Sequence, residues 1–198
     1  MGINIIEKTL HHRLFREVNA HLGNYISFNR NCTVETVEQT FFPGSKLLAI
    51  KDYNCIPVSS LMVVDNGVQT FLLSGAAQWE SILKNVSINL NIKNVLEYLK
   101  LYYSTYTLPY NHQRIVESID DIDFTEFPKS TLFEDISQQI QIPVVISSND
   151  LFTIYCNITT EQSLSDAAFE VFTNGKVELL EKKIVLSSLP IGELVVDL

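Results

Sequence analysis

Two Asn-Gly pairs lie between short apolar runs, and they constrain the fold more than any other feature of the chain. The pairs are Asn66-Gly67, directly after Asp65, and Asn174-Gly175. The apolar runs that flank them are residues 60–64 and 68–73, and residues 167–173 and 176–181. A two-residue type I′ turn needs positive φ at both central positions, and Asn and Gly adopt it readily. We therefore predict two antiparallel hairpins, the first of them closed by a type I′ turn.

Further short runs of apolar and β-branched residues predict more strands. They cover residues 46–51, 113–118, 143–147 and 151–158. The polar stretches at 148–150 and 159–166 are interpreted as loops. The chain from residue 143 onward is therefore expected to be a β meander.

Helices are predicted where apolar residues recur at steps of three or four. The expected helices are the segment up to Gly23, residues 76–83, a helix capped by Asn91 that stops before Pro109, and residues 131–139. Leu90 and Val95 form the hydrophobic staple of the third helix, which is the clearest of the four.

Strands and helices are grouped rather than strictly alternating, which favours an α+β fold with antiparallel sheet over a doubly wound parallel sheet. We expect the C-terminal meander and its hairpins to pack against a central amphipathic helix. That layout resembles the cone of cystatin-like and nuclear-transport-factor-like folds. No repeat or Gly/Ser linker divides the chain, so residues 1–198 are predicted to form a single domain.

The charge of the chain is acidic and unevenly distributed. The formal net charge is −9, and residues 117–198 carry 4 Lys or Arg against 15 Asp or Glu, a balance of −11. Binding to nucleic acid or to an anionic membrane surface is disfavoured, because both need clustered basic residues. If these charges gather on one surface, two functions remain possible: a binding face for a basic partner, or an acidic decoy that occupies such a partner.

Cofactor and metal signatures are missing from the sequence. Neither G-x-G-x-x-G nor G-x-x-x-x-G-K-[ST] occurs among the seven glycines, so no nucleotide cofactor is predicted. The acidic stretch 117–123 does not fit a calcium loop, and we predict no metal. The three cysteines are widely spaced, and no apolar run is long enough to span a bilayer. A cytoplasmic protein is the expectation.

Five tyrosines concentrate on the third helix and its exit, and they are the leading candidates for a binding site. They are Tyr98, Tyr102, Tyr103, Tyr106 and Tyr110, and the alternative interpretation is an aromatic core. Tyrosine combines an apolar ring with a hydroxyl, which suits a pocket wall or a protein interface. Tyr98 is expected to face outward. The missing catalytic motifs and these tyrosines predict a non-enzymatic binding or interaction module that associates with itself or with another protein.

A small enzyme is the alternative. The turn at residues 109–114 leads into a strand and places His112 and Arg114 where polar groups can point into a cleft. Together with Glu117 or Asp120, His112 would supply acid and base inside a cone-shaped pocket. This hypothesis requires these side chains to line one enclosed cavity.

Four short segments resemble an uncharacterised family of bacterial proteins of about 200 residues. They are Leu73-Ser74-Gly75, the stretch Asn94 to Lys100, Ile115-Val116-Glu117-Ser118, and more loosely Asn174 to Leu180. None of these segments is a catalytic motif. The resemblance implies one soluble bacterial domain and assigns no activity, ligand or site residue.

Overall fold

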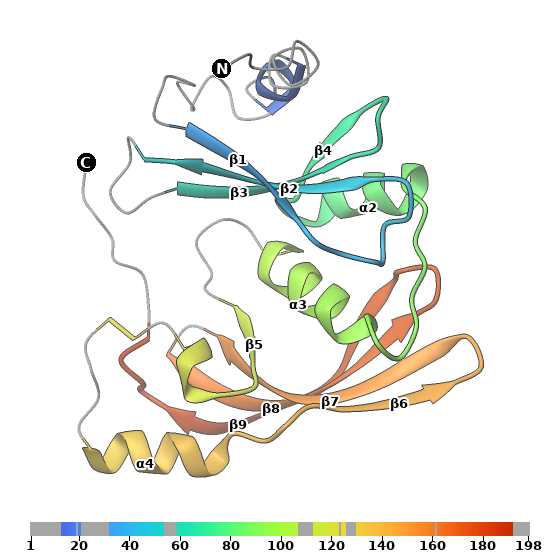
Figure 1. Cartoon of the computed structure of the whole chain (residues 1–198). Coiled ribbons are helices and arrows are strands. Elements are labelled where there is room, and N and C mark those ends of the chain that lie inside the picture. Colours follow the sequence, from blue (N-terminus) through green and yellow to red (C-terminus); the bar gives the residue numbers. More distant parts are fainter. Residues whose placement is uncertain are drawn as a thin grey trace. The chain divides into compact units, whose positions relative to one another are not determined.

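The structure is a computed structural model of the chain, and it is mixed α+β with antiparallel sheets (Figure 1). The described residues are 13–18, 20, 32–53, 59–106, 113–122, 124–125, 130–160 and 162–191. Tyr110, His112 and most of the first predicted helix lie outside these residues. The chain divides into two compact units, Met1–Leu73 with Ala77–Ser87, and Ser74–Ala76 with Ile88–Leu198. The single domain expected from the sequence stays a prediction.

The first unit is built on a four-stranded antiparallel sheet with the strand order β1-β2-β3-β4. Its elements are β1 (Cys32–Val37), β2 (Lys46–Asp52), β3 (Ser59–Asp65), β4 (Thr70–Leu72) and α2 (Ala76–Asn85). The helical residues 13–18 place Leu14 and Val18 against the buried Leu48, Ile50 and Val63 of the sheet. These apolar side chains hold the short helix and the sheet together.

The hairpin at Asn66-Gly67 is confirmed, but the prediction of a type I′ turn is wrong. Asp65 pairs with Thr70, so four residues form the loop, and Gly67 has a φ of 86° whereas Asn66 does not adopt positive φ. The Asn66 Oδ1 accepts hydrogen bonds from the N–H groups of Val68 at 3.0 Å and Gln69 at 2.8 Å. This side chain fixes the loop locally, which makes a tighter turn unnecessary.

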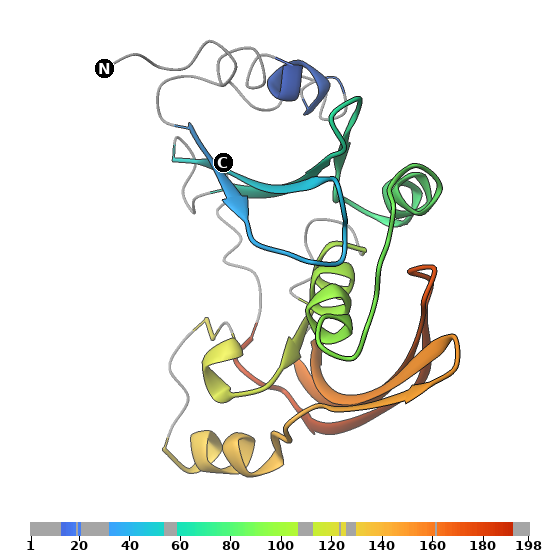
Figure 2. The same cartoon turned by 45° about the vertical axis from the view of Figure 1, so that its right-hand side comes forward.

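The second unit is built on a sheet with the order β5-β7-β8-β9, in which β6 also pairs with β7. Its strands are β5 (Arg114–Val116), β6 (Val144–Ser148), β7 (Leu151–Thr160), β8 (Ser163–Phe172) and β9 (Val177–Ser187). Its helices are α3 (Val95–Tyr106), the short η1 (Ile119–Asp121) and α4 (Ser130–Gln139). The sheet curves with α3 on one face and α4 on the other (Figures 1 and 2). This arrangement confirms the predicted antiparallel meander against an amphipathic helix.

The polar stretch at 159–166 is not the loop that the sequence suggested. β7 continues to Thr160 and β8 begins at Ser163, and these two residues pair. Thr160 is buried, and Leu164 and Ser165 are fully buried, so the strand residues of this stretch lie within the sheet. Threonine and serine side chains are compatible with strands, and here sheet pairing outweighs their polarity.

The hairpin at Asn174-Gly175 is confirmed. Gly175 takes a φ of 88°, its N–H donates to the Phe172 carbonyl at 2.8 Å, and Phe172 N–H donates to the Lys176 carbonyl at 2.9 Å. A three-residue loop closed by one left-handed glycine is the next most common hairpin connection after the two-residue turns.

The start of α3 is held by two asparagines. Asn91 Oδ1 accepts from Lys93 N–H at 2.9 Å, and Asn94 Oδ1 accepts from Asn91 N–H at 2.8 Å. The Asn94 amide also donates to the Asn89 carbonyl at 3.0 Å, and the residue is buried. Reciprocal bonds of this kind satisfy the N–H groups that a helix start leaves unpaired.

We expect Asn94→Ala to lower the free energy of unfolding by about 1–2 kcal/mol, because a buried residue loses its capping bonds. Urea unfolding followed by circular dichroism measures this change. Lys93→Ala, on the exposed side of the same turn, is the matched control and should stay within about 0.5 kcal/mol of wild type. Equal losses for the two variants would contradict the capping role of Asn94.

Candidate functional site

The tyrosines of α3 divide between the core and a cavity. Tyr98 is fully buried, and its hydroxyl donates to the Gly175 carbonyl at 2.6 Å. The expectation that Tyr98 faces outward is therefore wrong. The spacing from Val95 to Tyr98, Leu99 and Tyr102 places all four on the buried face of the helix, and Gly175 satisfies the hydroxyl there. Burial raises the Tyr98 pKa well above its ordinary value, so the phenol stays neutral.

A cavity of about 290 Å³ lies between the end of α3 and the sheet face that α3 covers. Its lining combines aromatic and aliphatic side chains with three polar ones: Tyr102, Tyr103, Tyr106, Gln113, Thr160, Phe169, Val177, Leu179 and Lys182. We call this space the tyrosine cavity. Three of the candidate tyrosines, Tyr102, Tyr103 and Tyr106, meet in it. The volume is near the lower end for small-molecule sites.

Stacked rings form the helical wall of the tyrosine cavity. The rings of Tyr102 and Tyr106 stack with their centroids 4.7 Å apart, and Tyr103 packs edge-on against Phe169 at 5.4 Å. Burial raises the pKa values of Tyr102 and Tyr103, and the neighbouring Tyr106 raises that of Tyr102 further. Both phenols are therefore neutral near pH 7 and offer flat apolar faces with hydroxyls at their edges.

Lys182 supplies the positive charge of the cavity. Its ammonium donates to Thr160 Oγ1 at 2.7 Å, and the described lining contains no carboxylate. Lys182 pairs with Ala167 on the face turned toward α3, whereas the neighbouring Lys183 pairs with Asp166 on the opposite face. A lysine beside a hydroxyl and an amide in an apolar cavity can bind an anion through charge-assisted hydrogen bonds.

Two further predicted site residues, Glu117 and Arg114, lie elsewhere. Glu117 is exposed and forms an ion pair with Lys100, which also contacts Glu97 at 2.9 Å. Arg114 is exposed on β5, and neither Glu117 nor Arg114 lines the tyrosine cavity. The structure does not bring these groups together with the tyrosines. Asp120 is also exposed, so the carboxylates of the acid–base hypothesis are not enclosed.

The acidic stretch folds on itself. Asp121 Oδ2 accepts from the N–H groups of Glu117 and Ser118, each at 2.8 Å. Partial burial acts to raise the Asp121 pKa, but these backbone hydrogen bonds lower it overall. In the part of the chain that the structure describes, no three His, Cys, Asp or Glu side chains gather as a metal site would require.

Sequence reasoning missed most of the sheet side of the cavity. Lys182 lay beyond the predicted end of the last strand, and Thr160 lay in a segment interpreted as a loop. The irregular pairing between β8 and β9, where Ala168 pairs with Glu181 and Phe169 with Leu179, shifts which β9 side chains face α3. Two consecutive lysines in a strand-like run were the available signal, because neighbouring residues of a strand point to opposite faces.

No family model, curated protein or solved structure matches the chain. The resemblance to a bacterial family and the cystatin-like layout therefore stay predictions. Among the described helices, none has the length and apolar character needed to cross a membrane.

Proposed function

We propose that the chain is a non-enzymatic binding module whose tyrosine cavity takes a small aromatic carboxylic acid. The observation that carries the proposal is the lining, which has stacked tyrosines and one ammonium, with no carboxylate among the described lining residues. The sheet side of this cavity belongs to the most acidic part of the chain, residues 117–198. A cavity whose charge opposes that of its surroundings favours an anion. The aromatic wall favours a flat apolar body.

The ligand is defined by its two parts, a carboxylate and an aromatic ring. The carboxylate would accept hydrogen bonds from Lys182 Nζ and from the amide of Gln113, while its ring packs against Tyr106 and Phe169. Neutral phenols at Tyr102 and Tyr103 do not repel an anion, whereas ionised ones would. The volume of about 290 Å³ admits a single ring with a short side chain rather than a nucleotide.

The experiment compares phenylacetate, phenylacetamide and phenethylamine, which share a ring and differ in charge. We expect phenylacetate to bind most tightly in calorimetric titration and to raise the melting temperature, because only it pairs with Lys182. Lys182→Met should weaken phenylacetate binding at least tenfold, consistent with the loss of a charged hydrogen bond.

Lys183→Met is the matched control, since it removes the same charge one residue away on the opposite face. It should change the affinity less than twofold. The proposal is wrong if phenylacetate does not bind, or if the two lysine variants lose affinity equally, because the second result would mean a general charge effect.

A further inference from the structure

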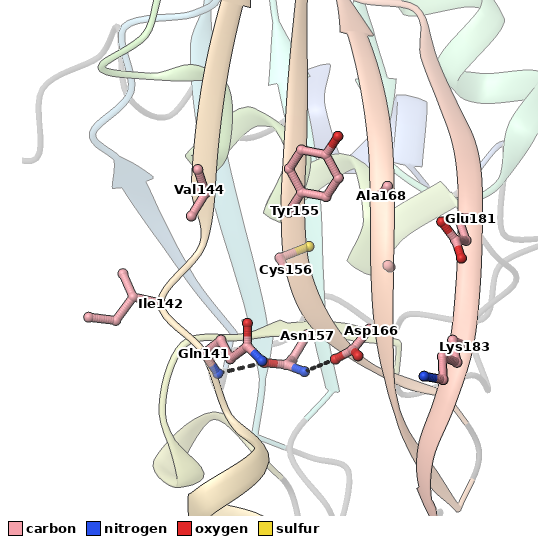
Figure 3. Close-up of a pocket in the computed structure, with 11 residues that line it drawn as sticks. Gln141, Ile142, Val144, Tyr155, Cys156, Asn157, Asp166, Ala168, Glu181 and Lys183 are labelled. Carbon is pink, nitrogen blue, oxygen red and sulfur yellow. Dashed lines mark hydrogen bonds between the residues drawn. The ribbon is translucent and has the colours of Figure 1, made fainter.

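The sheet face opposite the tyrosine cavity carries a second hollow of about 290 Å³ (Figure 3). Strand pairing orders its side chains into rows that cross the sheet. One row runs Val144, Tyr155, Ala168, Glu181, and the next runs Asn157, Asp166, Lys183. Ala168 is the small residue between Tyr155 and Glu181, and its missing side-chain volume leaves the hollow. We call this surface the outer face.

The outer face is apolar at one edge and acidic at the other. Along β6 and its neighbour the exposed fractions are 84% for Ile142, 53% for Val144, 51% for Ile146 and 50% for Tyr155. This face of β8 and β9 carries four carboxylates against one ammonium: Asp166, Glu170, Glu178 and Glu181 against Lys183, with Glu178 also paired with Lys176. Contiguous exposed apolar side chains on a folded protein commonly mark an interaction site.

The floor of the hollow is rigid. Asn157 is 1% exposed, and its side chain accepts from Gln141 N–H at 2.6 Å and donates to Asp166 Oδ1 at 2.9 Å (Figure 3). These two bonds tie the segment that follows α4 to β7 and orient the Asp166 carboxylate. A partner would therefore meet a surface that is already formed, which reduces the entropic cost of binding.

Helix packing against this face has a precedent within the same unit. Ile136 of α4 is fully buried in a cluster with Val116, Ile122, Leu164, Leu189 and Ile191. Leu164 belongs to the same face of β8 as Asp166 and Ala168, because residues two apart share a face. α4 therefore covers one end of the outer face and leaves the apolar edge and the hollow exposed.

We propose that the rest of the outer face docks a basic amphipathic helix of another protein. Tyr155 and Glu181 lie two strand spacings apart, roughly 10 Å, which matches the rise over seven residues of a helix. A leucine of the partner would pack on Val144 and Tyr155, and a Lys or Arg seven residues along would reach Glu181 and Asp166. The excess of carboxylates on this face selects a basic partner over an acidic one.

The test uses three synthetic peptides of 18 residues. The first has a leucine stripe at helical spacing flanked by lysines, the second has glutamate in place of each lysine, and the third is a scramble of the first without the stripe. Fluorescence anisotropy should show the first binding at least tenfold more tightly than either of the others. Equal binding of the scrambled peptide would overturn the proposal, because it would reflect net charge alone.

Two variants test whether the first peptide binds to the outer face. Glu181→Lys and Val144→Ser change exposed side chains and should each weaken the first peptide at least tenfold. Glu80→Lys, an equal charge change on the exposed side of α2, should alter the affinity less than twofold. An unchanged affinity in Glu181→Lys would overturn the proposal. A second result that would overturn it is sedimentation showing that another copy of the chain occupies this face and that Val144→Ser releases that copy.

Discussion

Replacing Tyr98 by phenylalanine is expected to lower the free energy of unfolding by about 1–2 kcal/mol, and replacing it by alanine by about 3–5 kcal/mol. The smaller loss comes from the hydroxyl, because Phe leaves the Gly175 carbonyl without its 2.6 Å hydrogen bond. The larger loss adds the cavity left by a fully buried ring. Urea unfolding of the two variants separates the hydrogen-bond contribution from the packing contribution.

Tyr155→Phe is the matched control, because it removes the same hydroxyl from a half-exposed ring. Its free energy of unfolding should stay within about 0.5 kcal/mol of wild type. If Tyr98→Phe behaved like this control, the bond to Gly175 would not stabilise the fold, and α3 would be held on the sheet by packing alone.

Tyr98 also shows where sequence reasoning reaches its limit. The helix was predictable from local signals, namely the Asn91 cap and the spacing of apolar residues. The direction of Tyr98 was not, because its hydroxyl is satisfied by a carbonyl 77 residues away. A polar atom on an otherwise apolar side chain favours solvent only when no buried partner exists, and such a partner is not visible in a local pattern.

In the two sheets, too, the features set by neighbouring residues were predictable and those set by distant residues were not. Both Asn-Gly hairpins were predictable because a turn depends on neighbouring residues, although Asn66 used its side chain to form a longer loop. The face that each β9 residue occupies depends on irregular pairing with β8, which no local pattern reveals. Three candidate tyrosines of the cavity could therefore be named from the sequence, whereas Lys182 could not.

Alkaline pH is expected to unfold the second unit, because it buries several groups that must lose a proton to become charged. Burial raises the pKa values of Tyr98, Tyr102 and Tyr103, and it raises the pKa of the Cys156 thiol from 9.0 to about 12. In the unfolded chain these groups ionise at roughly pH 9 to 10. The unfolded state then loses protons that the folded state keeps, so stability falls as the pH rises.

The window of this loss follows from the pKa values. The stability that these groups contribute is fully present below about pH 9 and is lost as the pH rises toward their folded pKa values, which for Cys156 is about 12. Each unit of pKa difference corresponds to about 1.4 kcal/mol, so the thiol alone accounts for roughly 4 kcal/mol over its full range. That is a large part of the stability of an ordinary domain.

Urea midpoints between pH 7 and pH 12 measure this effect. We expect a constant midpoint up to about pH 8.5 and a steep decline above pH 9. The last tyrosinates to form, those of Tyr98, Tyr102 and Tyr103, should appear together with the loss of circular dichroism. Cys156→Ala should flatten the decline between about pH 9 and 10, because the thiol ionises in the unfolded chain before the phenols do. Ionisation of all eight tyrosines while the circular dichroism is still intact would contradict the argument, since it would mean that the buried phenols ionise inside the folded unit.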